Sequence, residues 1–128
     1  MKGKMLVIDD EEGMRTLLEA LLMSLGIDSI CVDSAQDAMR ALTERTSEIT
    51  ACLLDMNLED AKGENLYDRL KEVSPDLAVF PMSGICADEI RERLAGRDIA
   101  GLISKPFSAS EFSKTVLDGI SQTPSGDH

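Results

Sequence analysis

The chain contains 128 residues, of which 43% are hydrophobic and 29% charged, and this composition is typical of one globular domain with a sizeable core. Its formal net charge of −11 disfavours binding to nucleic acid or to an anionic membrane. No apolar run approaches the roughly 20 residues of a transmembrane helix, and the N-terminus lacks the pattern of a signal peptide, so we expect a cytoplasmic protein.

Five short apolar runs predict five β-strands. Amphipathic segments separate the runs, which cover residues 4–8, 27–32, 50–54, 77–82 and 100–103. Strands that alternate with helices form a parallel sheet covered on both faces by the helices. The sequence therefore predicts an α/β fold whose binding site lies beyond the carboxyl ends of the strands.

Apolar residues at helical spacing predict a helix after each strand. The stripe of the first helix comprises Met14, Leu17, Leu18, Leu21, Leu22 and Leu25. Gly26 follows the end of this helix, Ser34 is the expected N-cap of the second, and the third must end before Pro75. Ser108 and Glu111 have the spacing of a capping box at the start of the last helix.

The three cysteines, Cys31, Cys52 and Cys86, have wide and irregular spacing. Two of them lie within apolar stretches. We therefore interpret all three as buried, reduced thiols, and not as metal ligands or disulfide partners.

Reactive side chains follow four of the five predicted strands. They are Asp9 and Asp10 after the first strand, Asp55 after the third, Ser83 and Gly84 after the fourth, and Lys105 and Pro106 after the fifth. Because the carboxyl ends of parallel strands share one edge, three carboxylates, a hydroxyl and an ammonium should converge there. Hard oxygen ligands with a high negative charge suit Mg²⁺.

Each of these residues also has a purely structural interpretation. The four consecutive acids at positions 9–12 suit the first turn of a helix, whose dipole favours negative charge, and we assign the last two of them to that role. Asp55 can cap a helix, and Ser83 and Lys105 can be ordinary loop or surface residues. All of these alternatives together require a coincidence, because every residue falls at the same sheet edge.

Four motifs, LVIDDE, CLLDMNLEDAKG, PMSG and ISKPF, occur in this order and at characteristic spacing. With them the chain resembles the receiver domain of bacterial two-component response regulators, from Met5 to about Ser121. The resemblance implies a flavodoxin-like, doubly wound fold with the strand order 2-1-3-4-5. It assigns residues 1–121 to the receiver domain and leaves residues 122–128 as a flexible tail or the start of a linker.

The resemblance also implies a phosphoacceptor and a metal site. Asp55 would take a phosphoryl group from a sensor histidine kinase or a histidine phosphotransfer protein and become an acyl phosphate. Mg²⁺, or Mn²⁺ in its place, would be bound by Asp10 directly, by Asp9 through a water, by Asp55, and by the backbone carbonyl of Asn57.

Four further residues match supporting positions of the family. Ser83 corresponds to the hydroxyl that bonds a phosphoryl oxygen, and Gly84 to the small residue that leaves room for the phosphoryl group. Lys105 corresponds to the ammonium that pairs with the acceptor and then with the phosphate. Pro106 corresponds to a proline that is usually cis and turns the lysine inward.

Two positions depart from the usual pattern. Glu59 stands where the family has a proline, so we expect the loop after Asp55 to be more mobile. Leu102 replaces the aromatic residue that swings inward on activation. Either coupling between Ser83 and the output face then runs through loop and backbone shifts alone, or Leu102 is a plain apolar packing or partner-contact residue. Ile85, two residues after Ser83, occupies a position that tunes water access, which suggests slow loss of the phosphoryl group.

The implied function is that of a signalling domain and not of an enzyme, although the domain assists its own Mg²⁺-dependent phosphorylation and dephosphorylation. Phosphorylation would shift the population between two conformers of the chain. The output face, near residues 86–117, would then bind a downstream protein, a tethered effector domain or a second copy of the chain. The alternative is a phosphorelay intermediate or phosphate sink with no effector switch.

Other functions fit the sequence less well. An aspartate-nucleophile phosphohydrolase would carry a D-x-D pattern after the first strand, where this chain reads DDEEG. A flavin electron carrier would need a Ser/Thr-rich phosphate loop and stacking aromatics, whereas the chain has no Trp and one Tyr. A histidine phosphotransfer protein is excluded because the only histidine is His128, at the end of the chain.

Overall fold

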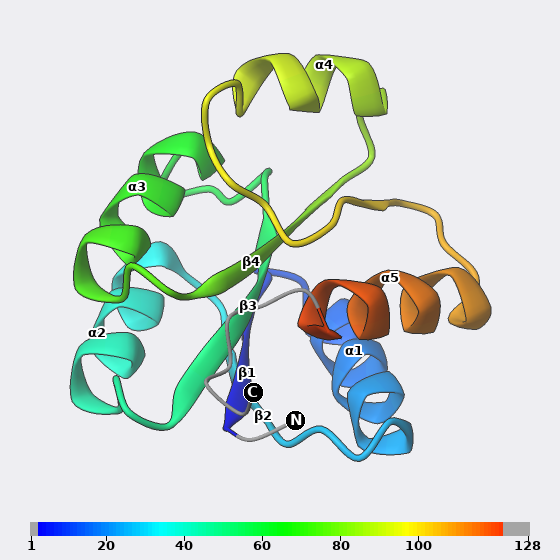
Figure 1. Cartoon of the computed structure of the whole chain (residues 1–128), viewed down its shortest axis with the longest axis horizontal. Helices are drawn as coiled ribbons and strands as arrows, with labels where there is room; N and C mark the ends of the chain where they lie inside the picture. Colours follow the sequence, from blue (N-terminus) through cyan, green and yellow to red (C-terminus); the bar gives the residue numbers. More distant parts are fainter. Residues whose placement is uncertain (1–2, 122–128) are drawn as a thin grey trace.

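A computed structural model of the protein describes residues 3–121. In this part of the chain, strands and helices alternate without interruption (Figure 1). The strands are β1 (Lys4–Ile8), β2 (Ser29–Val32), β3 (Ile49–Asp55), β4 (Ala78–Ser83) and β5 (Ile103–Ser104). The helices are α1 (Glu12–Ser24), α2 (Ala35–Glu44), α3 (Gly63–Val73), α4 (Ala87–Arg93) and α5 (Ala109–Ser121).

The five strands form one parallel sheet in the order β2-β1-β3-β4-β5. This confirms the predicted doubly wound, flavodoxin-like fold. The order reverses between β1 and β3, and Ile8 pairs with Leu54 at the carboxyl ends of these two strands. The residues that follow Ile8 and Leu54 therefore begin side by side at the switch point, where open α/β sheets bind ligands.

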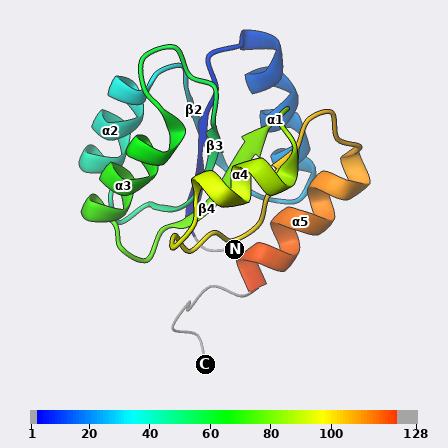
Figure 2. The ribbon, with the colours of Figure 1, turned by 90° about the horizontal axis from the view of Figure 1, so that it is seen from above.

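Helices cover both faces of the sheet (Figures 1 and 2). Leu6 and Ile8 face the core formed with α2, α3 and α4, whereas Met5 and Val7 face the core formed with α1 and α5. Successive residues of a strand point to opposite faces, so a strand buried on both faces consists of consecutive apolar residues. This explains the unbroken apolar run MLVI in β1.

The predicted helix ends agree with the structure. The Ser34 hydroxyl accepts a hydrogen bond from the Asp37 amide at 3.1 Å, and α3 ends at Val73. Ser108 and Glu111 form the predicted capping box, in which each residue's side chain accepts from the other's amide, at 2.9 and 3.1 Å. The local signals for capping were therefore sufficient at these positions.

Two predictions of burial were wrong. Leu17 was assigned to the inner stripe of α1, yet it is 45% exposed, because Leu18 and Leu22 face the sheet and Leu17 lies about 100° around the helix from Leu18. Cys86 is exposed in the loop before α4, whereas Cys52 is buried and Cys31 is partly buried. All three cysteines are free thiols.

The fifth strand is shorter than predicted. The Ala100 amide still donates to the Val79 carbonyl at 2.8 Å, but the regular ladder begins only at Ile103. Gly101 lies between them, and a Cβ atom there would come within 2.8 Å of Thr115. Close packing against α5 therefore requires a glycine at a position where it weakens strand formation.

None of the helices among residues 3–121 is long and apolar enough to cross a membrane. The predicted tail, residues 122–128, lies outside the described residues. The proposed limit of the domain at residue 121 therefore remains a prediction.

Candidate functional site

Three carboxylates meet at the carboxyl edge of the sheet. Asp9 and Asp10 follow β1, and Asp55 ends β3, and one oxygen from each lies within 4.8 Å of the others. Asp9 and Asp55 are only 1% and 3% exposed, whereas Asp10 is exposed. At an effective dielectric of about 20, two carboxylates ~4 Å apart repel by about 4 kcal/mol. The cluster therefore favours the binding of a cation.

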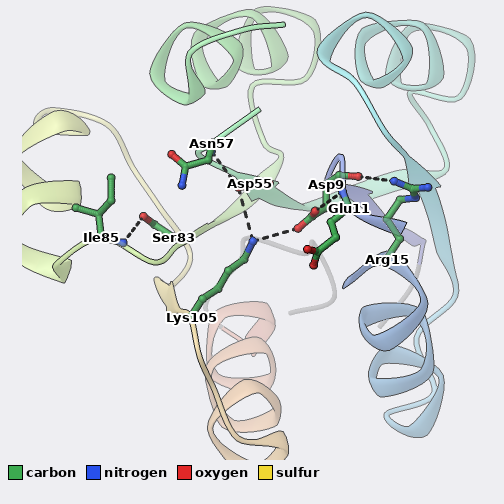
Figure 3. A network of polar contacts seen from close by, with 8 residues as sticks. All are labelled: Asp9, Glu11, Arg15, Asp55, Asn57, Ser83, Ile85 and Lys105. Carbon is green, nitrogen blue, oxygen red and sulfur yellow. Dashed lines mark hydrogen bonds and ion pairs between the residues drawn. The ribbon is translucent and has the colours of Figure 1, made fainter. Parts of the chain in front are cut away.

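Lys105 supplies one cation to this cluster (Figure 3). Its ammonium donates a hydrogen bond to Asp9 Oδ2 at 3.2 Å and lies 3.7 Å from Asp55 Oδ1. The Lys105 amide donates to the Ser83 carbonyl at 2.8 Å, and the bond between Lys105 and Pro106 is cis. The lysine thus contacts both buried acids, and it contacts Asp9 more closely than Asp55.

Asp9 is held through both its backbone and its side chain. Its amide donates to the Val32 carbonyl at 3.2 Å, and its carbonyl accepts from the Arg15 guanidinium at 2.9 Å (Figure 3). Its Oδ1 atom accepts from the Glu11 amide at 2.9 Å. Arg15 was not predicted to support the site, because nothing in the local sequence pattern distinguishes it from a surface arginine of α1.

Asp55 experiences opposing influences on its ionisation. Burial is the largest and raises the pKa of Asp55 above its ordinary value. The Asn57 amide, which donates to Oδ1 at 2.9 Å, and the Lys105 ammonium lower this pKa, while the charges of Asp9 and Asp10 raise it. The net effect is upward, so the folded protein disfavours an ionised Asp55 while no further cation is bound.

Ser83 ends β4, the strand next to β3, and Gly84 follows it. Ser83 is 2% exposed, and its hydroxyl accepts a hydrogen bond from the Ile85 amide at 2.9 Å (Figure 3). A Cβ atom added to Gly84 would meet nothing within 4 Å. The space beside Gly84 is therefore open in this conformation.

Leu102 and Ile85 are partly buried and pack against the core beneath α2, α3 and α4. Leu102 thus makes apolar packing contacts in this conformation. Pro106 is exposed.

The loop between β3 and α3, residues 56–62, is attached to the rest of the fold through Asp60. The Asp60 carboxylate accepts from the amides of Ala35, at 3.0 Å, and Gln36, at 3.3 Å, at the start of α2. The hydrogen bond from Ala35 is the main cause of the lowered pKa of Asp60. The expectation of a mobile loop, based on Glu59, took no account of this attachment.

The donor set suits a hard divalent cation. Carboxylate oxygens from Asp9, Asp10 and Asp55 converge, and the chain turns at Asn57, where the amide is already oriented by Asp55. Mg²⁺ prefers one or two carboxylates together with waters and phosphate oxygens. A buried carboxylate beside two further acids and a lysine is an arrangement that can accept a phosphoryl group.

Comparison with known proteins identifies one family. The family model for the response regulator receiver domain matches residues 5–117 of this chain. The alkaline phosphatase synthesis transcriptional regulatory protein PhoP of Bacillus subtilis is 31% identical over 120 residues, which cover 91% of this chain and 48% of that protein. The sensory/regulatory protein RpfC of Xanthomonas campestris is 26% identical over 119 residues, which cover 90% of this chain and 16% of that protein.

Solved structures agree with this result. NtrX from Brucella abortus superposes with a TM-score of 0.82 at 26% identity, covering 94% of this chain and 28% of that chain. A response regulator receiver domain protein from Clostridium thermocellum superposes with a TM-score of 0.80 at 24% identity, covering 94% and 95% of the two chains. The chain spans about half or less of the length of the curated relatives it matches.

Proposed function

The chain belongs to the response regulator receiver domain family, and on that premise we propose that Asp55 accepts a phosphoryl group from a phosphohistidine. The donor is a sensor histidine kinase or a histidine phosphotransfer protein. The observation that carries this proposal is the convergence of three carboxylates and Lys105 at one sheet edge, with Asp55 buried at its centre.

Asp55 is the nucleophile in this reaction. Among residues 3–121, the Asn57 amide and the Lys105 ammonium both contact Oδ1 of Asp55, so we expect Oδ2 to attack phosphorus. A bond forms between this oxygen and phosphorus as the bond from phosphorus to the histidine nitrogen breaks, and the electron pair of that bond returns to the imidazole. The product is an aspartyl phosphate.

Two side chains receive the phosphoryl group. The Ser83 hydroxyl accepts from the Ile85 amide, which leaves its own hydrogen available for a phosphoryl oxygen. The Lys105 ammonium lies between the two buried acids and can move from them to the new negative charge. Preorganised donors of this kind stabilise charge on transferring phosphoryl groups.

Mg²⁺, or Mn²⁺, fits the remaining donors. Asp9, Asp10, Asp55 and the Asn57 carbonyl would hold it, and when bound it would neutralise charge on the phosphoryl oxygens. Without such a cation the three acids repel an anionic donor, so phosphorylation should be strictly metal-dependent.

The output of the domain is a change in partner binding. Its relatives include a sensory/regulatory protein and a transcriptional regulatory protein, so the face formed near residues 86–117 can act on a separate protein or on a tethered effector. The bond from Ser83 to the phosphoryl group would favour one of two conformers of this face.

Leu102 favours a second candidate, a relay or phosphate sink without an effector switch, because leucine cannot swing inward as an aromatic residue does. Hydrogen exchange of residues 86–117, with and without a phosphoryl-mimicking metal fluoride, separates the two. Altered protection indicates a switch. Unchanged protection, with the fluoride shown to bind, indicates a relay or sink.

Intact-protein mass spectrometry tests the phosphoacceptor chemistry. The chain is incubated with a small-molecule phosphodonor in Mg²⁺ or in chelator, beside an Asp55→Asn variant. We expect one added phosphoryl group in Mg²⁺ only, and none on the variant. An adduct in chelator, or equal labelling of Asp55→Asn, would refute the proposal.

A further inference from the structure

Asp60 links two segments that are far apart in the sequence. Its carboxylate oxygens both lie 3.0 Å from the Ala35 amide, and one of them lies 3.3 Å from the Gln36 amide. These amides belong to the first turn of α2, where helical N–H groups have no partner within the helix. The Ser34 hydroxyl accepts from the next amide, that of Asp37, so the loop completes a cap that α2 provides only in part.

The junction between β2 and α2, residues 32–36, also contacts the loop after β1, residues 9–11. The Asp9 amide donates to the Val32 carbonyl at 3.2 Å. The junction supplies no candidate metal ligand, yet it is hydrogen-bonded to both segments that do. It therefore connects the loop after β1 to the loop after β3 independently of the pairing between those strands.

The other restraints on the loop after β3 include a hydrogen bond from the Asn57 amide to Asp55 Oδ1 at 2.9 Å and the burial of Met56. Its start is held by the Met56 amide, which donates to the Met82 carbonyl at 3.0 Å, and Leu58 is buried. Residues 56–62 contain no proline, so no ring fixes the backbone there. Asn57 lies two residues beyond the strand, where its carbonyl position depends on the conformation of the loop.

We propose that Asp60 is a positioning residue for metal binding, because it anchors the loop of Asn57 to the junction that also holds Asp9. The inference rests on the proposed function, since it assumes that Asn57 and the three acids bind Mg²⁺. Mg²⁺ demands near-ideal octahedral geometry, so a loop that is free to shift presents a worse ligand set. Asp60 acts through hydrogen bonds and does not touch the metal.

Calorimetric titration with Mg²⁺ tests this role, well below the melting temperature of each variant. We expect Asp60→Ala to weaken Mg²⁺ binding about tenfold, the lower end of the range for residues that orient metal ligands. Asp60→Asn keeps a carbonyl acceptor for the helix amides and should restore most of the affinity. Asp60→Ser, with a shorter acceptor, should lie between them.

The matched control is Glu59→Gln. Glu59 is the neighbouring exposed acid, and it makes no hydrogen bond or ion pair among residues 3–121. This variant removes one charge from the same loop but leaves the anchor intact, and we expect a change of about twofold or less at physiological salt.

The outcomes distinguish the two proposals. If the wild-type chain binds no Mg²⁺, the proposed function fails. If the wild type binds Mg²⁺ and Asp60→Ala matches Glu59→Gln, the function stands and the positioning role is refuted. If Asp60→Ala does not fold, weaker Mg²⁺ binding in Asp60→Ser than in Glu59→Gln supports the role, and equal binding in these two variants refutes it. A tenfold loss in Asp60→Asn contradicts its basis in hydrogen bonding.

Discussion

At the scale of single residues, Asp55 has a position that suits phosphoryl transfer and disfavours stability. It is buried beside two other acids, and its pKa is raised chiefly by burial. A buried carboxylate that is incompletely compensated weakens the fold. The burial of Asp55 therefore lowers the free energy of unfolding.

This conflict predicts that Asp55→Asn stabilises the protein in chelator at pH 7. The amide removes the charge but can still accept from the Asn57 amide, so the free energy of unfolding should rise on the order of 1 kcal/mol. Urea denaturation measures it, and an exposed carboxylate on α5, in Asp118→Asn, is the control. A clear loss of stability in Asp55→Asn alone would contradict this explanation.

The effect should also depend on pH. Since the folded pKa of Asp55 is raised above its ordinary 3.8, its protonated form favours the fold. That contribution is present below pH 3.8 and is lost as pH rises through the raised value. The advantage of Asp55→Asn should therefore be largest at neutral pH and shrink in acid.

At the scale of elements, two arginines connect α4 and the turn after it to α3. Arg93 donates to both carboxylate oxygens of Glu64, at 3.1 and 2.7 Å, and Arg97 donates to both oxygens of Asp68, at 2.9 Å each. The Tyr67 hydroxyl also donates to the Asp98 carbonyl. Movement of α4 on activation would have to break or carry along these contacts.

The pair of Arg93 and Glu64 predicts a specific pH dependence. The hydrogen bonds from Arg93 lower the pKa of Glu64 from 4.5 to about 2. A lowered pKa contributes stability that is complete above 4.5 and is lost as pH falls through about 2. Glu64→Gln should therefore cost roughly 1 kcal/mol at pH 7 and progressively less below pH 4.5.

Urea denaturation at pH 7, 4 and 3 checks this prediction. Asp68→Asn is the matched comparison, because the Asp68 side chain is 51% exposed against 22% for Glu64, and it should lose less. A Glu64→Gln deficit that stays constant over this range would contradict the assigned cause.

Packing of α5 on the sheet gives another test. A Cβ atom at Gly119 would overlap the Phe80 ring and approach the Ala100 carbonyl oxygen to 2.8 Å, whereas one at Gly13 in α1 would meet nothing. Overpacking costs about 1–3 kcal/mol, and alanine gains up to about 1 kcal/mol in a helix. Thermal unfolding should show Gly119→Ala destabilised and Gly13→Ala unchanged or stabilised, and the reverse order would contradict the packing described.

At the scale of the whole molecule, the architecture was predictable because the local apolar patterns and the order of the elements indicate the same fold. Apolar runs marked all five strands, and the alternation with helices implied a parallel sheet. The strand order came from the resemblance, since periodicity alone does not state which strands are neighbours. The gathering of Asp9, Asp10 and Asp55 followed from the shared carboxyl edge of parallel strands.

The contacts that support the site were not predictable in the same way. Arg15 holds the Asp9 backbone, and Asp60 caps a helix 25 residues away in the sequence. Such contacts depend on which surfaces meet in space, whereas the sequence reports only spacing along one chain. The predicted burial of Leu17 and Cys86 was wrong for a related reason. Hydrophobic character does not show how far an apolar stripe extends around a helix or into a loop.

The central claim is that this chain carries its phosphoryl group on Asp55. The most direct measurement treats the phosphorylated chain with borohydride, which reduces an acyl phosphate to an alcohol and so converts an aspartyl phosphate to homoserine, and then locates the altered residue by tandem mass spectrometry. We predict homoserine at position 55 after reaction in Mg²⁺, and unaltered aspartate at positions 9 and 10. Homoserine at position 9 or 10, or a phosphoryl group on a residue that borohydride does not reduce, would contradict the account.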